Sequence, residues 1–192
     1  MGKKNKKKQF KSYTKKLKKN NTWQAPPGYK IVVIDRGAAS FNMPQDWIIA
    51  DLDPLEIHDA QPPDDEIRLK VTVFQFGKGI NWSALPLPAL FAQSLTQETS
   101  TKNNLLERSE ITSYGRDDIE FLWVEDRFTE QVEKRDAYSR IGIARGFDVH
   151  VLITVDFWPE DRERAIRAWD EVLRSLQLGR EIDDPTKGVT LH

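Results

Sequence analysis

The chain has 192 residues, of which 39% are hydrophobic and 31% charged, and its formal net charge at pH 7 is −1. This is enough apolar material for one domain with a real hydrophobic core. The absence of cysteine excludes disulfides, thiolate metal sites, a cysteine nucleophile and a lipid-anchored cysteine.

The charge is distributed very unevenly along the chain. The first 19 residues contain ten lysines and no acidic residue, whereas all 30 acidic residues lie in the rest of the chain. A block of like charges stays extended unless a partner neutralises it. We therefore predict a lysine-rich disordered tail and linker over residues 1–28, a single α+β domain over 29–179 and a polar C-terminal tail over 180–192.

The lysines of the N-terminal tail are the candidate polyanion-binding residues. They are Lys3, Lys4, Lys6, Lys7, Lys8, Lys11, Lys15, Lys16, Lys18 and Lys19. Lysine favours non-specific phosphate attraction, because base-specific readout uses the bidentate fork of arginine. Phe10, Tyr13 and Leu17 lie at helical spacing, so a short helix is expected on a polyanion. Two alternatives remain: shallow insertion into an anionic membrane, and folding of the tail onto the acidic body.

The N-terminal lysines are not followed by an apolar stretch, so we expect no secretory signal. The longest apolar runs are strand-sized, which predicts no transmembrane helix. A cytoplasmic location is the expectation that fits both features.

Strands dominate the first half of the expected domain. Periodicity and turn residues place them at 29–35, 38–43, 47–52 and 67–76. Residues 53–66 show no periodicity and are interpreted as an acidic, proline-rich loop. A helix is predicted over 86–98, with an apolar stripe formed by Leu87, Leu90, Phe91 and Leu95.

The second half is predicted to be an antiparallel meander followed by a helix. The expected strands cover 106–113, 118–128, 136–145 and 147–156, with turns at Tyr114-Gly115-Arg116 and at Gly146. The last helix begins at Pro159 and ends at a Gly179 C-cap, and residues 180–192 are expected to fray. Its predicted buried stripe is Ile166, Trp169, Leu173 and Leu176. The resulting fold class is α+β, a mostly antiparallel sheet of about six to eight strands with two helices packed on it.

Two sequence segments resemble the PsbP-like superfamily, which includes the photosystem II extrinsic protein and the Mog-type Ran-binding and DcrB-like proteins. The first is Phe41-Asn42-Met43-Pro44-Gln45-Asp46-Trp47, which is similar to an F-x-x-P-x-x-W opening. The second is Phe157-Trp158-Pro159-Glu160, which leads into a helix containing Trp169, Leu173 and Leu176. The resemblance covers roughly residues 29–178 and implies the fold and a non-catalytic accessory role.

The residues do not form a recognisable catalytic or metal-binding pattern. His58, His150 and His192 lack metal-ligand spacing, and no Gly-x-Ser-x-Gly elbow occurs. The acidic cluster of Asp51, Asp53, Glu56, Asp64, Asp65 and Glu66 is interpreted as a solvated loop rather than a Ca²⁺ site. Gly77-Lys78-Gly79 is too short for a phosphate-binding loop.

These features predict a protein that is not an enzyme and has no cofactor or metal. We expect a binding or accessory module whose tail docks on nucleic acid or a nucleoprotein while the domain contacts a protein partner. The alternative is a peripheral membrane protein that uses the same tail on anionic lipid.

Overall fold

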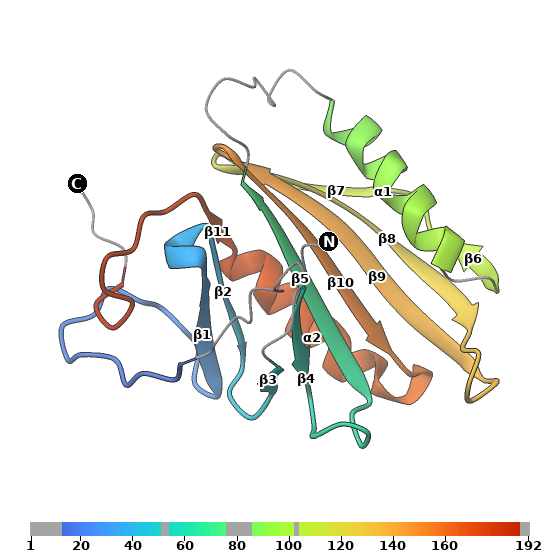
Figure 1. The fold of residues 1–192 in the computed structure, drawn as a ribbon, viewed down its shortest axis with the longest axis horizontal. Helices are drawn as coiled ribbons and strands as arrows, with labels where there is room; N and C mark the ends of the chain where they lie inside the picture. The colour runs from blue at the N-terminus through green and yellow to red at the C-terminus, as the bar shows by residue number, and fades with distance from the viewer. Residues whose placement is uncertain (1–12, 51–53, 76–85, 102–103, 189–192) are drawn as a thin grey trace, which may run out of the picture.

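Two antiparallel sheets and two helices make up the protein in a computed structural model, which describes residues 13–50, 54–75, 86–101 and 104–188 (Figure 1). The three-stranded sheet has the order β1-β2-β11, from Tyr29–Ile34, Ala39–Pro44 and Gln177–Leu178. The eight-stranded sheet has the order β3-β4-β5-β10-β9-β8-β6, with β7 also paired to β8. Its strands are Ile48–Ala50 (β3), Leu55–His58 (β4), Ile67–Gln75 (β5), Leu105–Arg108 (β6), Thr112–Arg116 (β7), Ile119–Thr129 (β8), Asp136–Gly146 (β9) and Val149–Phe157 (β10).

The large sheet buries both of its faces, because each face carries one helix. On one face the side chains of Ile141 and Ile143 pack with α1 (Leu87–Thr101). On the other face Val151, Ile153 and Val155 join the core that contains α2 (Arg162–Ser175). Successive residues of a strand point to opposite faces, so the two-sided apolar pattern of β9 and β10 requires a cover on each side.

The small sheet lies on the same side of the large sheet as α2 and shares its core. Phe41 and Met43 of β2 are each 1% exposed, and Trp169 of α2 is fully buried beside them in the same cluster. Phe121 and Trp123 approach the ring of Trp169 edge-on, with centroid distances of 5.7 and 6.1 Å. Edge-to-face aromatic packing of this kind holds α2 against the large sheet.

The predicted α+β class, with a mostly antiparallel sheet and two helices, is confirmed. The hairpin around Gly146 joins β9 to β10 as expected. Pro159 opens a single 3-10 turn, Pro159–Asp161, that continues directly into α2. Within the part of the chain that the structure describes, no helix is both long and apolar enough to cross a membrane.

Three local predictions about the large sheet are wrong. The segment 53–66 contains β4, which pairs with β5 through Leu55 opposite Val71 and His58 opposite Arg68. The single strand expected over 106–113 is divided into β6 and β7, which both pair with β8. Gly115 lies inside β7 rather than in a turn, since the ladder with β8 continues past it. Pairing with a partner strand, rather than local periodicity, decides these elements.

The end of α2 also differs from the prediction. The helix stops at Ser175, because Leu176 adopts an extended conformation with ψ at 127°. Gly179 therefore follows β11 rather than capping the helix, although its φ of +62° is the left-handed value expected of a glycine at a turn. The most buried positions of α2 include Ala165, Ala168 and Val172 besides Trp169, whereas Ile166 is only half-buried.

Candidate functional site

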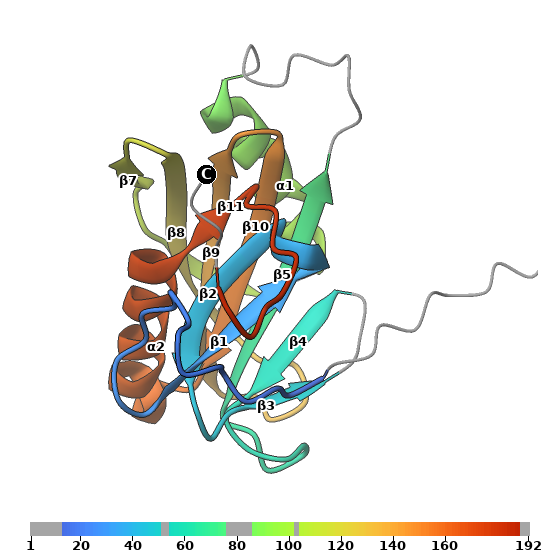
Figure 2. The same ribbon diagram turned by 90° about the vertical axis from the view of Figure 1, so that its left-hand side faces the viewer.

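Two segments from opposite ends of the chain lie side by side and are called the strap here: residues 18–23 and 180–188 (Figure 2). The Lys18 amide donates to the carbonyl of Thr186 at 2.9 Å, and the Thr22 amide donates to that of Lys187 at 2.8 Å. The Lys18 Nζ is 2.9 Å from Asp184 Oδ2. These contacts join the root of the lysine-rich tail to the domain.

The second segment of the strap is held by the turn after β1. Its backbone amides at Arg180 and Ile182 donate to the carbonyls of Gly37 and Arg36, at 3.0 and 2.9 Å. Gly37 has a φ of +103°, and a Cβ there would lie 1.8 Å from the Arg180 carbonyl oxygen, so only glycine fits. Ile182 is 2% exposed. The expectation that this stretch frays is therefore wrong for residues 180–188.

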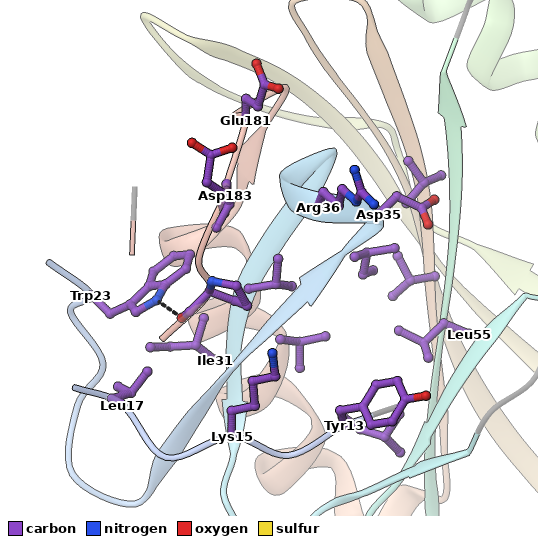
Figure 3. A pocket seen from close by; sticks show the side chains of 18 of the residues that line it. Tyr13, Lys15, Leu17, Trp23, Ile31, Asp35, Arg36, Leu55, Glu181 and Asp183 are labelled. Carbon is purple, nitrogen blue, oxygen red and sulfur yellow. Dashed lines mark hydrogen bonds between the residues drawn. The ribbon is translucent and has the colours of Figure 1, made fainter. Parts of the chain in front are cut away.

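A cleft of about 820 Å³ opens beneath the strap, between β1 and the β4–β5 part of the large sheet (Figure 3). Its walls are mostly aliphatic, formed by Ile31, Val33, Ile34, Ile49, Leu55, Val71 and Val73. Asp35, Arg36, Glu181 and Asp183 gather toward one end, and the Tyr13 and Lys15 side chains lie toward the other. The volume is in the range of ligand-binding cavities.

The edge of one sheet forms a wall of this cleft. β1 is the terminal strand of the small sheet and pairs only with β2 among the described residues. An edge strand of this kind presents backbone donors and acceptors to anything that enters beside it. The indole of Trp23 covers part of the opening, and its Nε1 is fixed by a 2.8 Å hydrogen bond to the Pro185 carbonyl.

The described lysines of the tail are all exposed. Lys15, Lys16 and Lys19 form no ion pair within residues 13–50, 54–75, 86–101 and 104–188, whereas Lys18 binds Asp184. Tyr13 and Leu17 are also exposed, at 75% and 42%. The remaining six predicted lysines, Lys3, Lys4, Lys6, Lys7, Lys8 and Lys11, lie outside the described residues.

The acidic cluster is only partly the solvated loop that its sequence suggests, because Asp64 and Glu66 are exposed whereas the Asp65 side chain is buried and Glu56 lies in β4. The side chain of Asp65 is only 5% exposed, and its Oδ2 lies 2.8 Å from Nδ1 of the buried His58. Burial raises the pKa of Asp65, but the hydrogen bonds and charges of His58 and Arg68 outweigh it, so the net pKa is lowered. Glu56 lies 3.6 Å from the other ring nitrogen of His58. Each ring nitrogen of His58 therefore has a carboxylate as its neighbour.

The other chemical candidates are structural in the described part of the chain. His150 is 2% exposed, and burial together with the charge of Arg145 lowers its pKa. No group of three or more His, Asp or Glu residues suited to a metal ion occurs among the described positions. Asp51, Asp53 and Gly77-Lys78-Gly79 lie outside those positions.

The arrangement of sheets and helices defines a class of protein, the PsbP-like fold. CyanoP, the cyanobacterial PsbP of Synechocystis sp. PCC 6803, superposes with a TM-score of 0.59 at 12% identity, over 81% of this chain and 95% of that one. LpqN of Mycobacterium tuberculosis, which is involved in cell envelope biogenesis, superposes with a TM-score of 0.54 at 11% identity, over 78% and 89%. The predicted resemblance to the PsbP-like superfamily is confirmed at the level of the fold.

Sequence similarity places the protein more narrowly. The family model described as Alr1449 matches residues 30–182. The uncharacterised protein alr1449 of Nostoc sp. (strain PCC 7120) is 37% identical over 175 residues, covering 90% of this chain and 89% of that protein. The chain belongs to the Alr1449 family.

Proposed function

We propose that this protein is a non-catalytic accessory module that docks through its basic tail on nucleic acid or a nucleoprotein and binds a protein partner through its domain. The main support is the exposure of Lys15, Lys16 and Lys19, which have no ion-pair partner in the described ranges. A tail that served only to neutralise the acidic body would pair more of these lysines with its carboxylates.

The strap supports this function because it attaches the tail to the domain. Lys18 and Trp23 tie the root of the tail to residues 184–187. Because the tail is tied to the domain, binding of the tail to a polyanion also holds the domain there, without direct contact between the domain and the polyanion. Attraction of this kind depends on counterion release and weakens steeply as salt is added.

The cleft beneath the strap supports the partner half of the proposal. Its aliphatic walls and the outer edge of β1 match an extended apolar segment, which would add to the small sheet by backbone hydrogen bonds and fill the cleft with alternate side chains. The acidic side chains at one end, Asp35, Glu181 and Asp183, favour a basic residue at one end of that segment.

The experiment that tests the tail compares the full-length chain with a variant in which the nine tail lysines other than Lys18 are replaced by glutamine. Lys18 is kept because it pairs with Asp184. Binding to duplex DNA, to RNA and to anionic vesicles is measured across a salt series. For the wild type we expect a salt slope that corresponds to about 5–10 neutralised phosphates on nucleic acid, and loss of binding in the variant.

A control variant carries Lys134→Gln and Lys187→Gln, two exposed lysines outside the tail, and should bind like the wild type. Vesicle binding without nucleic-acid binding would overturn docking on nucleic acid and favour the membrane alternative, in which the exposed Tyr13 and Leu17 insert into lipid. Failure to bind any polyanion would overturn the tail's proposed role altogether.

A further inference from the structure

A second cavity, of about 460 Å³, lies outside the cleft, between β2, β11 and the end of α2. The apolar part of its lining comes from Trp23, Ile31 and Phe41. The polar part is larger in number and includes Ser40, Asn42, Gln177 and three arginines, Arg116, Arg174 and Arg180. Trp23 and Ile31 also line the cleft and Arg180 belongs to the strap, but the tail binding proposed above uses none of the other lining residues.

Two buried oxygen atoms in this lining have no hydrogen-bond partner among the described residues. Ser40 is 1% exposed, and neither its Oγ nor the Oε1 of Gln177 accepts or donates a hydrogen bond within the described chain. The two residues are direct partners across β2 and β11, so their side chains share one face of the small sheet. Buried polar side-chain atoms are nearly always paired, and an unpaired one weakens the fold.

The neighbouring polar groups contrast with these two oxygens, because they are satisfied. Asn42 Nδ2 donates to Glu171 Oε1 at 2.7 Å and to the Gln24 carbonyl at 3.1 Å, and the Asn42 amide donates to Ser175 Oγ at 2.8 Å. The sheet and helix therefore provide partners for Asn42 within the lining, and the pairing stops at Ser40 and Gln177, which are neighbours across β2 and β11.

The charge of the lining is positive. Among the described lining residues, Asp118 is the one acidic residue against three arginines. Each guanidinium nitrogen of Arg116 already has a partner, since the group donates to Asp118 and to the carbonyls of Arg174 and Leu176. Arg180 is the least engaged of the three: its closest carboxylate oxygen, on Asp118, is 3.9 Å away, and its guanidinium lies 5.4 Å from the centroid of Phe147.

Arg174 has spare hydrogen-bonding capacity as well. Its Nε and Nη2 bind Glu171 at 2.8 and 2.6 Å, while its Nη1 has no partner in the part of the chain that the structure describes. Two guanidinium groups with uncommitted N–H donors beside one cavity match the geometry of a carboxylate or phosphate group.

We propose that this cavity binds a small organic oxyanion, a carboxylate or phosphate that also carries a hydroxyl or amino group. Arg180 and Arg174 hold the charged group. The hydroxyl or amino group donates to Gln177 Oε1, and the Ser40 hydroxyl pairs with a ligand oxygen. The ring of Trp23, held by its bond to Pro185, forms a flat apolar wall for the carbon skeleton of the ligand. The volume suits a molecule larger than inorganic phosphate.

The test is isothermal titration of the full-length protein with citrate, glycerol 3-phosphate and inorganic phosphate, together with melting temperatures. We expect citrate or glycerol 3-phosphate to bind with 1:1 stoichiometry, and the stronger of the two distinguishes a carboxylate from a phosphate ligand. Inorganic phosphate should bind more weakly because it reaches fewer of the groups. Arg180→Gln should weaken binding about 10-fold, as expected for loss of a charge-assisted hydrogen bond.

Ser40→Ala separates a ligand-binding role from a structural one. In the ligand-free protein its melting temperature should equal or exceed that of the wild type, because an unpaired buried hydroxyl is removed, while ligand binding should weaken. Arg167→Gln is the matched control, an exposed arginine of α2 that does not line the cavity. The Arg167→Gln variant retains all tail lysines, so any binding of anions to the tail is the same as in the wild type.

Three results would overturn the proposal. The first is that neither organic anion binds below about 10 mM, which would indicate a cavity filled by water alone. The second is that Arg180→Gln and Arg167→Gln bind alike, which would place the anion on the tail or elsewhere. The third is a lower melting temperature for ligand-free Ser40→Ala, since that would show that the hydroxyl is paired inside the fold.

Discussion

Gly142→Ala is expected to destabilise the fold by overpacking its aromatic core. Gly142 lies in β9, and a Cβ there would be 2.3 Å from Cζ and 2.9 Å from Cε1 of Phe121, and 3.1 Å from Cη2 of Trp169. Carbon atoms in contact are about 3.5 Å apart, so the Phe121 ring would have to move by about 1 Å. Phe121 is 1% exposed and Trp169 is fully buried, which leaves little free space for that movement.

Overpacking of this kind costs about 1–3 kcal/mol, and the clash with two fixed rings belongs in the upper half of that range. Replacing glycine also restricts the unfolded chain, which offsets about 0.4–1 kcal/mol. The net loss in the free energy of unfolding should therefore be about 1–2.5 kcal/mol. Urea unfolding followed by circular dichroism measures it as a lower midpoint with an unchanged m-value.

Gly115→Ala is the control for this prediction. A Cβ at Gly115 would meet only the Ile119 carbonyl oxygen, at 3.9 Å, so stability should stay the same or rise by up to about 1 kcal/mol. A Gly142→Ala protein that is as stable as the wild type would refute the reasoning, because it would mean that the contact between the β9 backbone and the two rings is loose.

Two further predictions concern the ion pair at the end of α2 and the cleft. Burial raises the pKa of Glu171, but hydrogen bonds from Arg174 and Asn42 lower it more, so the folded-state pKa is depressed. The stability that ionised Glu171 contributes is present above the unfolded pKa of about 4.3 and is lost as the pH falls through the folded pKa. In urea titrations the wild type should be more stable than Glu171→Gln by about 1 kcal/mol at pH 7, and this difference should shrink toward pH 3. Parallel pH profiles of stability for the two proteins would contradict this prediction. Val33→Lys places a charge in the cleft wall and should abolish capture of a protein partner that the wild type retains. Val132→Lys, at a site that is 83% exposed, is the control and should capture the partner like the wild type. Equal capture by both variants would exclude the cleft as the contact surface.

Elements with a strong local pattern could be predicted from the sequence, and elements with a weak one could not. Ile67, Leu69 and Val71 alternate cleanly, and β5 is where that alternation places it. β4 consists of Leu55–His58 within an acidic, proline-rich segment, which is too short for a period to stand out. Its pairing with β5 is what makes it a strand. The same applies to Gly115, whose local turn signal is overridden by the ladder between β7 and β8.

Most residues of the candidate sites could not be predicted from the sequence. Ser40 and Asn42 alternate with apolar neighbours in β2, a pattern typical of a half-exposed strand, yet both are buried. Ile182 is an isolated apolar residue in a polar stretch, and this was the one local signal that the C-terminal segment packs. The tail lysines, in contrast, were evident because a charge block needs no tertiary structure to be recognised.

By itself the sequence determined the fold class and the division of charge, because alternation, helical spacing and a run of lysines are properties of neighbouring residues. Only the tertiary structure decided the strap, the cleft and the second cavity. The bond from Lys18 to Asp184 spans 166 residues, and that from Asn42 to Glu171 spans 129. Such partners are chosen by the packing of whole sheets and helices, since nothing in the local chain distinguishes the lysine that pairs from the lysines beside it.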